Sequence, residues 1–242
     1  MEADELHVKY LGTDAVLYGT VMHILVRKLL RKGSLSANTS EMWTRLLSAY
    51  AEQGVATQFT SVRMSMFLPD PKQPDKHYPR LKGRGAEIKN LCTPILKVFS
   101  DAKRVGNPDD AMLESILVHQ RDAQDILDLH GDDVFLPVES ARKFKMHIEL
   151  MLRDYAKMAL KADAQGELLF STIPKHHILW HLADRAIYVN PRRVGTFQSE
   201  DLVGRFKPIV KSAASGTAAH MIASKCATKW RWGKSLYLAS AK

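Results

Sequence analysis

Apolar side chains recur at helical spacing along nearly the whole chain. The first such segment covers residues 5–31, where Leu6, Tyr10 and Leu17 follow a period close to 3.6 residues. Its most apolar stretch, residues 15–26, is shorter than the roughly 20 residues that a bilayer-spanning helix needs. This stretch therefore predicts a buried helix, and the chain as a whole predicts no membrane partner.

Turn residues separate the next segments. Gly33 and Ser34 follow the first helix, and a capping residue within 38–40 predicts the start of a second one. Residues 61–67 alternate apolar and polar side chains, which fits a short strand or a short helical continuation equally well. Residues 69–82 contain four prolines and predict an exposed loop.

Long helical patterns fill the rest of the chain. Asn107 is a favourable N-cap, and Pro108 suits the first turn of the helix that comes after it. The further helices are expected at 85–103, 108–130, 138–164 and 174–188, from Ser199 and from Thr217. The pattern predicts an all-α fold of about eight helices in an irregular bundle, with at most a short strand near residues 61–67.

The basic residues are concentrated near the C-terminus. Residues 171–242 carry the whole net charge of +9, whereas residues 1–170 are neutral. Such asymmetry favours a polyanionic partner, nucleic acid first, although a solvated basic surface would give the same composition. We therefore distinguish residues 1–170, a helical bundle with the exposed loop at 69–82, from residues 171–242, a basic helical region of the same continuous domain.

Two short motifs combine histidine with a second polar group. Asp4 and His7 are three residues apart, so the carboxylate could orient the imidazole, or Asp4 could only cap the helix. His177 and His181 have the spacing of a helical metal pair, but no third ligand is evident from the sequence. A packed or surface histidine pair is therefore the favoured interpretation.

Glu200 stands among cations that could hold a phosphate backbone. Mg²⁺ takes oxygen ligands, usually one or two carboxylates and substrate phosphates, so Glu200 is a candidate metal ligand. The alternative is an acidic first turn of a helix that begins at Ser199. The candidate nucleic-acid-binding cations are Lys175, Arg192, Arg193, Arg205, Lys207, Lys211, Lys229, Arg231 and Lys234.

Few other motifs restrict the function. Trp230 and Trp232 flank Arg231, a pattern that can stack on bases or dock a last helix onto the core. Cys92 and Cys226 are far apart and give neither a disulfide framework nor zinc-ligand spacing, which fits a reducing compartment. No phosphate-binding loop, dinucleotide fingerprint or nucleophile elbow occurs.

Three segments in order resemble eukaryotic cut-and-paste transposases of the CACTA and Kyakuja–Dileera–Zisupton-like groups. They are DELHVKYLGTDAVLYGTVMHIL, LKGRGAEIKNL and PKHHILWHL followed by VGTFQSEDLVGRFK. The resemblance implies an RNase H-like catalytic fold with a helical insertion before the third catalytic carboxylate. Two Asp and one Glu of that family hold divalent metal ions that activate water or a 3′-hydroxyl for attack on DNA.

The resemblance assigns roles to individual residues. Glu200 matches the third carboxylate, and Asp4 with His7 matches a D-x-x-H motif that supports the site; His177 and His181 lie in the third segment. The family's first two catalytic aspartates precede D-x-x-H, and only three residues precede Asp4 here. The chain thus resembles the helical insertion and the third-carboxylate helix. A nuclear location is expected on the same ground.

The leading hypothesis is a transposase-derived DNA-binding fragment that is catalytically incomplete and needs no cofactor on its own. One alternative is a helical protein–protein interaction module without a nucleic-acid role. Another is a metal-dependent nuclease or strand-transfer subunit, in which a second chain, or the pair Asp132 and Asp133, supplies the missing carboxylates and Mg²⁺ binds. A missing N-terminal catalytic portion or a second copy of the chain is a further possible partner.

Overall fold

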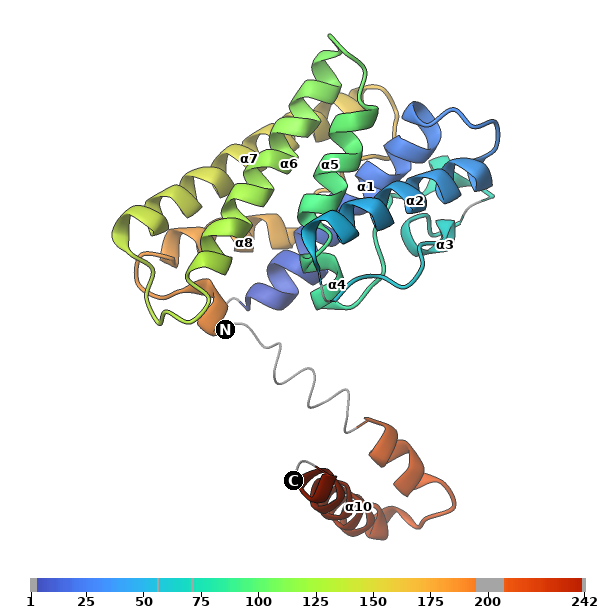
Figure 1. The fold of residues 1–242 in the computed structure, drawn as a ribbon, viewed down its shortest axis with the longest axis vertical. Coiled ribbons are helices and arrows are strands. Elements are labelled where there is room, and N and C mark those ends of the chain that lie inside the picture. The colour runs from blue at the N-terminus through green and yellow to red at the C-terminus, as the bar shows by residue number, and fades with distance from the viewer. Residues whose placement is uncertain (1–3, 56, 71, 195–206, 241–242) are drawn as a thin grey trace. The chain divides into compact units, whose positions relative to one another are not determined.

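The computed structural model describes residues 4–55, 57–70, 72–194 and 207–240 (Figure 1). Within these ranges every regular element is a helix, which confirms the predicted all-α fold. The chain divides into two compact units, Met1–Gly195 and Thr196–Lys242. None of the helices in the described ranges combines the length and apolar character that crossing a membrane requires.

The first unit contains α-helices with shorter π- and 3-10 segments between them. In chain order they are η1 (Leu6–Asp14), α1 (Ala15–Ile24), η2 (Leu25–Leu29), α2 (Leu35–Gln53), α3 (Met64–Phe67), η3 (Pro74–Lys76), α4 (Gly85–Lys89), α5 (Cys92–Ala102), α6 (Pro108–Leu129), α7 (Val138–Ala164), α8 (Pro174–Arg185) and η4 (Pro191–Val194).

The N-terminal helix runs without a break from η1 through α1 to η2. All residues of α1 are buried, as its apolar pattern predicts. The two ends differ from the prediction because they are π-helical, with the N–H of Leu30 donating to the carbonyl of Leu25, five residues back, at 2.8 Å. A π-helix changes which side chains share a face, so the 3.6-residue period does not describe these ends.

Helix starts reflect local side-chain chemistry. Asn107 caps α6 as predicted, accepting from the N–H groups of Asp109 and Asp110 at 3.0 Å each. Helix α2 starts earlier than predicted, because Ser34 accepts from the N–H of Ala37 at 3.1 Å. Asn38, inside the predicted cap, instead donates to the carbonyl of Val26 at 2.7 Å and ties α2 to the N-terminal helix.

The single helix predicted over 85–103 is two helices, α4 and α5. Pro94 lies in the first turn of α5, where a missing N–H costs no hydrogen bond. In an unbroken helix its ring would clash with the carbonyl of Asn90, four residues earlier. The chain turns at Asn90, whose side chain donates to the carbonyl of Thr57 at 2.7 Å.

The segment at 61–67 forms no strand; its second half is the one-turn helix α3. The chain then leads through the proline-rich loop back to α1, where Leu81 is 2% exposed. The N–H of Leu81 donates to the carbonyl of Ala15 at 2.8 Å. Gly19 makes this approach possible, because a Cβ there would lie 2.7 Å from the backbone nitrogen of Leu81.

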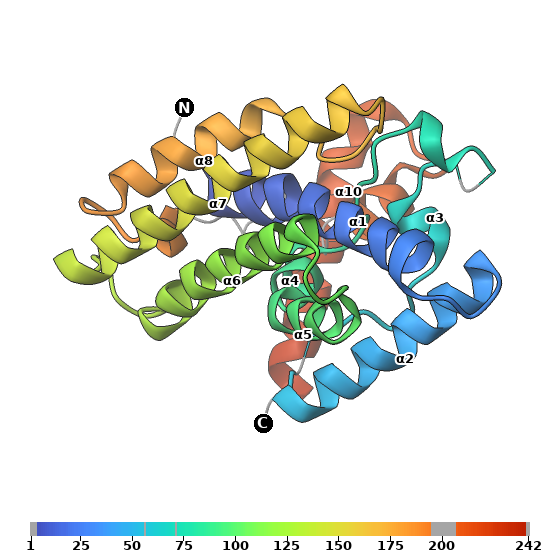
Figure 2. The ribbon, with the colours of Figure 1, turned by 90° about the horizontal axis from the view of Figure 1, so that it is seen from above.

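The N-terminal helix occupies the middle of the first unit (Figure 2). Helices α8 and α4 pack against η1, and α3 and α5 pack against α1. Helices α6 and α7 pack along each other, and α8 covers α7. Polar side chains of η1 are therefore enclosed by α4 and α8, which come from distant parts of the sequence.

The second unit is a helical hairpin. Residues 207–214 are helical, Gly216 makes the turn with φ +63°, and α10 (Ala219–Ser240) completes the hairpin. Ala213 and Cys226, one on each helix, are buried. Lys229 Nζ reaches back to the carbonyl of Ser212 at 3.2 Å and to its hydroxyl at 2.9 Å.

Candidate functional site

Asp4 and His7 contact each other at the start of η1. Asp4 Oδ2 is hydrogen-bonded to His7 Nδ1, and Asp4 Oδ1 accepts from the N–H of Leu6 at 3.0 Å. One carboxylate thus both orients a ring and caps the helix, so the two interpretations open at the sequence level coexist. The His7 side chain is 50% exposed, so this ring lies at the surface.

His177 and His181 also contact each other, with 3.0 Å between their Nε2 atoms, on the exposed side of α8. The ring of Trp180 packs against His181 with 4.9 Å between centroids. Within the part of the chain that the structure describes, no third metal-binding side chain joins this pair. The arrangement matches the surface histidine pair favoured from the sequence.

Three of the candidate cations, Lys175, Arg192 and Arg193, lie in the first unit, and both arginines have partners there. Lys175 packs along η1 beside Gly12, and burial, together with the nearby Arg80 charge, lowers its pKa. Arg192 pairs with Asp128 and donates to the carbonyl of Leu127 at 3.3 Å.

Arg193 donates to the backbone carbonyls of Asp132 and Asp133. The amide of Asn190, which is fully buried, donates to the carbonyls of His130 and Asp133 at 2.7 and 2.9 Å. Together with Arg192, these residues fasten η4 to the α6–α7 turn. Asp132 and Asp133, the candidate replacement carboxylates, are thus held in this turn through their backbone.

Three candidate residues lie wholly or partly outside the described part of the chain. Glu200 and Arg205 lie outside the described residues. Lys234 belongs to α10, but its side chain also lies outside the described part. The third-carboxylate assignment, with its expected Mg²⁺, therefore stays a prediction.

The second unit contains many more cations than carboxylates. Residues 196–242 contain eight Lys or Arg and two Asp or Glu, and residues 202–242 contain no acidic side chain. Lys207, Lys211 and Arg231 are exposed. Lys225 bonds to the hydroxyl of Thr217 at 2.6 Å, and Lys229 bonds to oxygens of Ser212, so neither charge is neutralised by these contacts.

The aromatic residues near Arg231 are partly accessible. Trp232 is 68% exposed and Trp230 is half-buried. The exposure of Trp232 leaves its ring face available for stacking on a planar partner.

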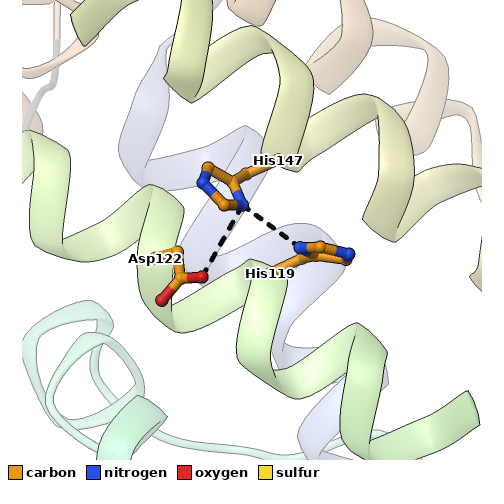
Figure 3. A group of neighbouring side chains, drawn as sticks. All are labelled: His119, Asp122 and His147. Carbon is orange, nitrogen blue, oxygen red and sulfur yellow. Dashed lines mark hydrogen bonds and ion pairs between the residues drawn. The ribbon is translucent and has the colours of Figure 1, made fainter.

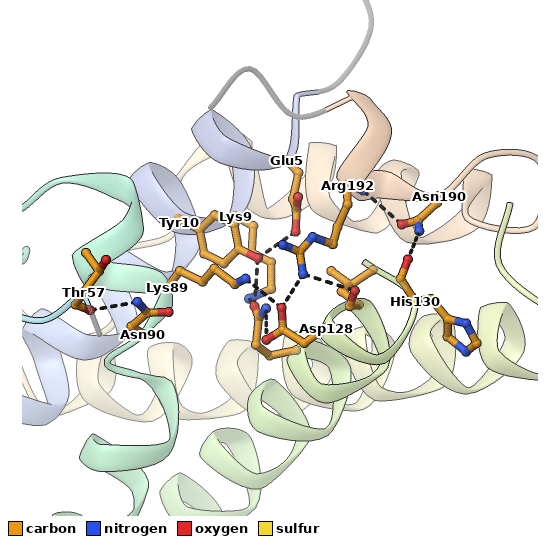
Figure 4. Close-up of polar contacts among 12 residues, drawn as sticks. Glu5, Lys9, Tyr10, Thr57, Lys89, Asn90, Asp128, His130, Asn190 and Arg192 are labelled. Atoms are coloured by element: carbon orange, nitrogen blue, oxygen red, sulfur yellow. Dashed lines mark hydrogen bonds and ion pairs between the residues drawn. The ribbon is translucent and has the colours of Figure 1, made fainter. Parts of the chain in front are cut away.

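A buried polar network surrounds η1 (Figure 4). Lys9 Nζ lies 2.9 Å from Asp14 Oδ2 and 3.0 Å from Gln124 Oε1. The Tyr10 hydroxyl lies 2.7 Å from Glu5 Oε1 and 2.9 Å from Gln124 Oε1, and donates its hydrogen to one of them. Burial raises the pKa of both Glu5 and Asp14.

The π-helix explains why these pairs form. Glu5 and Tyr10 are five residues apart, and so are Lys9 and Asp14. In an α-helix such residues point about 140° apart, whereas in a π-helix, bonded from residue i to i+5, they lie nearly above one another. The network is not evident from the sequence, because an α-helical period places residues five apart on different faces.

The network continues outward through α6. Gln124 Nε2 donates to Asp128 Oδ2 at 3.0 Å, and Lys89 Nζ donates to Asp128 Oδ1 at 2.7 Å. Arg192 binds the same carboxylate (Figure 4). Asp128 thus joins α4, α6 and η4, which indicates a structural role for Arg192.

A second histidine cluster, not anticipated from the sequence, joins α6 and α7 (Figure 3). His119 Nδ1 lies 3.1 Å from His147 Nδ1, and His147 Nδ1 lies 3.7 Å from Asp122 Oδ2. All three side chains are partly buried, and burial lowers the pKa of His147 despite the nearby Asp122 charge. The only signal in the sequence is H-x-x-D within a helix, which is weak without the tertiary partner.

A cavity of about 280 Å³ lies beside η2. Its lining includes His23, Arg27, Lys28, Asp75 and Glu167. Arg27 pairs with Asp75 at 3.2 Å and Lys28 with Glu167 at 2.6 Å, so the charged lining is internally balanced. His23 is 4% exposed, and its Nδ1 has no hydrogen-bond partner in the described residues.

No protein-family model, curated protein or solved structure matches this chain.

Proposed function

We propose that this protein binds DNA through its second unit, the hairpin of residues 207–214 and α10. The observation that carries the proposal is the one-sided charge of this unit. Of the overall net charge of +9, residues 196–242 supply +6, with eight basic and two acidic side chains. A duplex carries one phosphate charge per about 1.7 Å of its axis, so a short helix with several cations can meet several phosphates.

The first unit offers a contrast within the same molecule. Most of its Lys and Arg side chains lie within ion-pairing distance of a carboxylate, as Arg104 does with Asp110 and Lys161 with Asp109. A phosphate must compete with that carboxylate. Lys225 and Lys229 bond to neutral oxygens, so a phosphate can replace their partners without leaving an unpaired anion.

These contacts favour the DNA backbone over its bases. Lysine is a flexible point charge, and phosphate contacts position a protein without reading sequence. The exposed ring of Trp232 adds a surface on which an unpaired base can stack. Binding is therefore expected to depend steeply on salt, to show little sequence preference and to include single strands.

The resemblance to cut-and-paste transposases supports the same partner and is the basis for a transposase-derived origin. That family cuts DNA with three carboxylates and divalent metal ions. The proposal assigns no catalytic set to this chain and is limited to binding. A nuclear location remains part of the same proposal.

The test is DNA binding by the full chain, measured by fluorescence anisotropy with a labelled duplex and a labelled single strand across a salt series. The neutralised variant carries Lys207→Gln, Lys211→Gln, Lys225→Gln and Lys229→Gln. Each phosphate contact contributes about 0.9 to the slope of log K against log salt, so the slope should fall by about 3 to 4.

A matched control removes the same charge from exposed positions of the first unit. It carries Lys32→Gln, Lys72→Gln, Lys76→Gln and Lys82→Gln, all of which are exposed in the native chain. This control should keep the native affinity and slope. Absence of binding at low salt, or equal losses in both variants, would overturn the proposal.

A further inference from the structure

We propose that His119, Asp122 and His147 bind a divalent transition-metal ion of the Zn²⁺ type between α6 and α7. The three side chains come from two packed helices: His119 and Asp122 lie one turn apart on α6, and His147 faces them from α7 (Figure 3). One ligand atom from each residue lies within 4.8 Å of the other two. This site belongs to the first unit and does not depend on DNA binding.

The spacing of the ligand atoms suits a tetrahedral ion. Bonds of about 2.0–2.1 Å place neighbouring ligand atoms of a tetrahedron about 3.3 Å apart. The Nδ1 atoms of His119 and His147 are 3.1 Å apart, and His147 Nδ1 and Asp122 Oδ2 are 3.7 Å apart. Both distances lie within a few tenths of an ångström of that edge. The three ligand atoms all lie within 4.8 Å of one another, so side-chain rotations can close the site.

The donor atoms select the kind of metal. Two imidazole nitrogens and one carboxylate oxygen suit Zn²⁺ and its neighbours in the transition series. Mg²⁺ and Ca²⁺ require sets made of oxygen atoms, so they fit this cluster poorly. Three protein ligands leave a fourth tetrahedral position for water or another small ligand.

A neighbouring guanidinium orients the carboxylate. Arg121 donates to Asp122 Oδ1 from Nε at 2.9 Å and from a terminal nitrogen at 2.6 Å. This contact leaves Oδ2 directed at His147, as ligand-supporting hydrogen bonds do in metal sites. Arg121 opposes a bound cation, but Asp125 Oδ2, 3.6 Å from Arg121 Nε, offsets part of its charge.

The alternative is a histidine pair that needs no ion. A neutral ring can donate its Nδ1 hydrogen to the lone pair of the other ring across 3.1 Å. In that case the cluster is only a polar contact in the α6–α7 interface. The two interpretations differ in what Asp122 does, because a hydrogen bond between the rings does not require the carboxylate, whereas a metal site does.

The test is titration of the full chain with two metal ions. Calorimetry measures the affinity for Zn²⁺, and visible absorption follows Co²⁺, which absorbs intensely when it is tetrahedral. The native chain should bind one ion at this site and give the tetrahedral spectrum. His147→Gln and Asp122→Asn should each weaken Zn²⁺ binding at least tenfold and abolish that spectrum. Millimolar Mg²⁺ should not displace the cobalt.

The matched control is His181→Gln, which breaks the surface pair on α8 and should leave the cobalt spectrum unchanged. Circular dichroism checks that each variant is folded, and Asp122→Asn decides the outcome if His147→Gln does not fold. The proposal is wrong if the native chain gives no tetrahedral cobalt spectrum. It is also wrong if Asp122→Asn binds as tightly as the native chain, or if His181→Gln abolishes the spectrum.

Discussion

Lys9 Nζ lies 2.9 Å from Asp14 Oδ2, and the two side chains are 0% and 1% exposed. Removal of one partner leaves the other charge buried without compensation, which costs about 3–5 kcal/mol in comparable pairs. We therefore expect Lys9→Met to lower the free energy of unfolding by about that amount in urea denaturation. The double variant Lys9→Met with Asp14→Leu should recover much of the loss.

The matched control for this pair is Lys28→Met. Lys28 pairs with Glu167, but their side chains are 38% and 39% exposed, so water screens the pair. Loss of this pair in Lys28→Met should lower the free energy of unfolding by less than about 1 kcal/mol. Equal destabilisation by the two Lys→Met substitutions would show that burial does not set the strength of the Lys9 pair.

His23 should make folding stability depend on pH. Burial, the largest cause, and the Arg27 charge lower its pKa from 6.5 to about 4. Between these values the unfolded chain binds the proton and the folded chain does not. Stability should therefore fall as the pH drops from about 6.5 to about 4, by at most about 3 kcal/mol from this group, and no further below.

The measurement is the difference in unfolding free energy between the native chain and His23→Leu across this pH range. Leucine removes the titrating group together with its Nδ1 atom, which has no hydrogen-bond partner among the residues that the structure describes. The difference should change with pH as described. A pH-independent difference for His23→Leu would mean that the ring takes up its proton at the same pH in the folded and the unfolded chain.

Gly19→Ala should destabilise the protein although alanine favours helices. The added Cβ would lie 2.7 Å from backbone atoms of Arg80 and Leu81, which would push the segment off α1 and strain the bond from Leu81 to Ala15. We expect a loss of about 1–3 kcal/mol in urea denaturation.

Gly131→Ala is its control. There the nearest atom to an added Cβ is the carbonyl oxygen of Asp128 at 3.4 Å, an ordinary contact. Gly131→Ala should leave the free energy of unfolding nearly unchanged. A neutral or stabilising result for Gly19→Ala would contradict the close approach of the 80–81 backbone to α1.

Arg192→Gln should separate folding from DNA binding. Arg192 binds Asp128, whose side chain is 44% exposed, and also the Leu127 carbonyl. Its loss should cost about 1–2 kcal/mol of stability, less than about 1 from the partly exposed ion pair and about 1 from the hydrogen bond to the carbonyl. The slope of log K against log salt for DNA binding should change by less than about 0.9, the contribution of one phosphate contact. A stable variant with a clearly reduced slope would instead place Arg192 at the phosphate backbone.

The sequence predicted the elements whose signals are local. The cap at Asn107 and the apolar stripes of α6 and α7 needed no tertiary information, because capping and amphipathic periodicity are properties of a short window. The candidate pair Asp4 and His7 was found for the same reason. The concentration of cations near the C-terminus was evident from composition alone.

Features that depend on distant residues were not predictable in this way. The cluster of His119, Asp122 and His147 needs His147 opposite an H-x-x-D pair, and nothing within α6 indicates this partner. The break before α5 could have been found from Pro94, whose ring excludes the carbonyl four residues earlier. The partners of Arg192 are also not indicated by the sequence, because Asp128 of α6 is 64 residues away from it along the chain.

The side-chain pairs of the π-helix at the start of the chain depend on a fixed number of residues between their members. Deletion of one residue between Glu5 and Lys9 would leave Glu5 and Tyr10 four residues apart, a spacing that an α-helical ladder keeps on one face. Lys9 and Asp14 would still be five residues apart, so the same ladder would turn them about 140° away from each other. Deletion of Leu6 would in addition leave Asp4 and His7 only two residues apart, on different faces of the helix. Length variation here should therefore be tolerated far less than amino-acid replacement at the exposed His7 position.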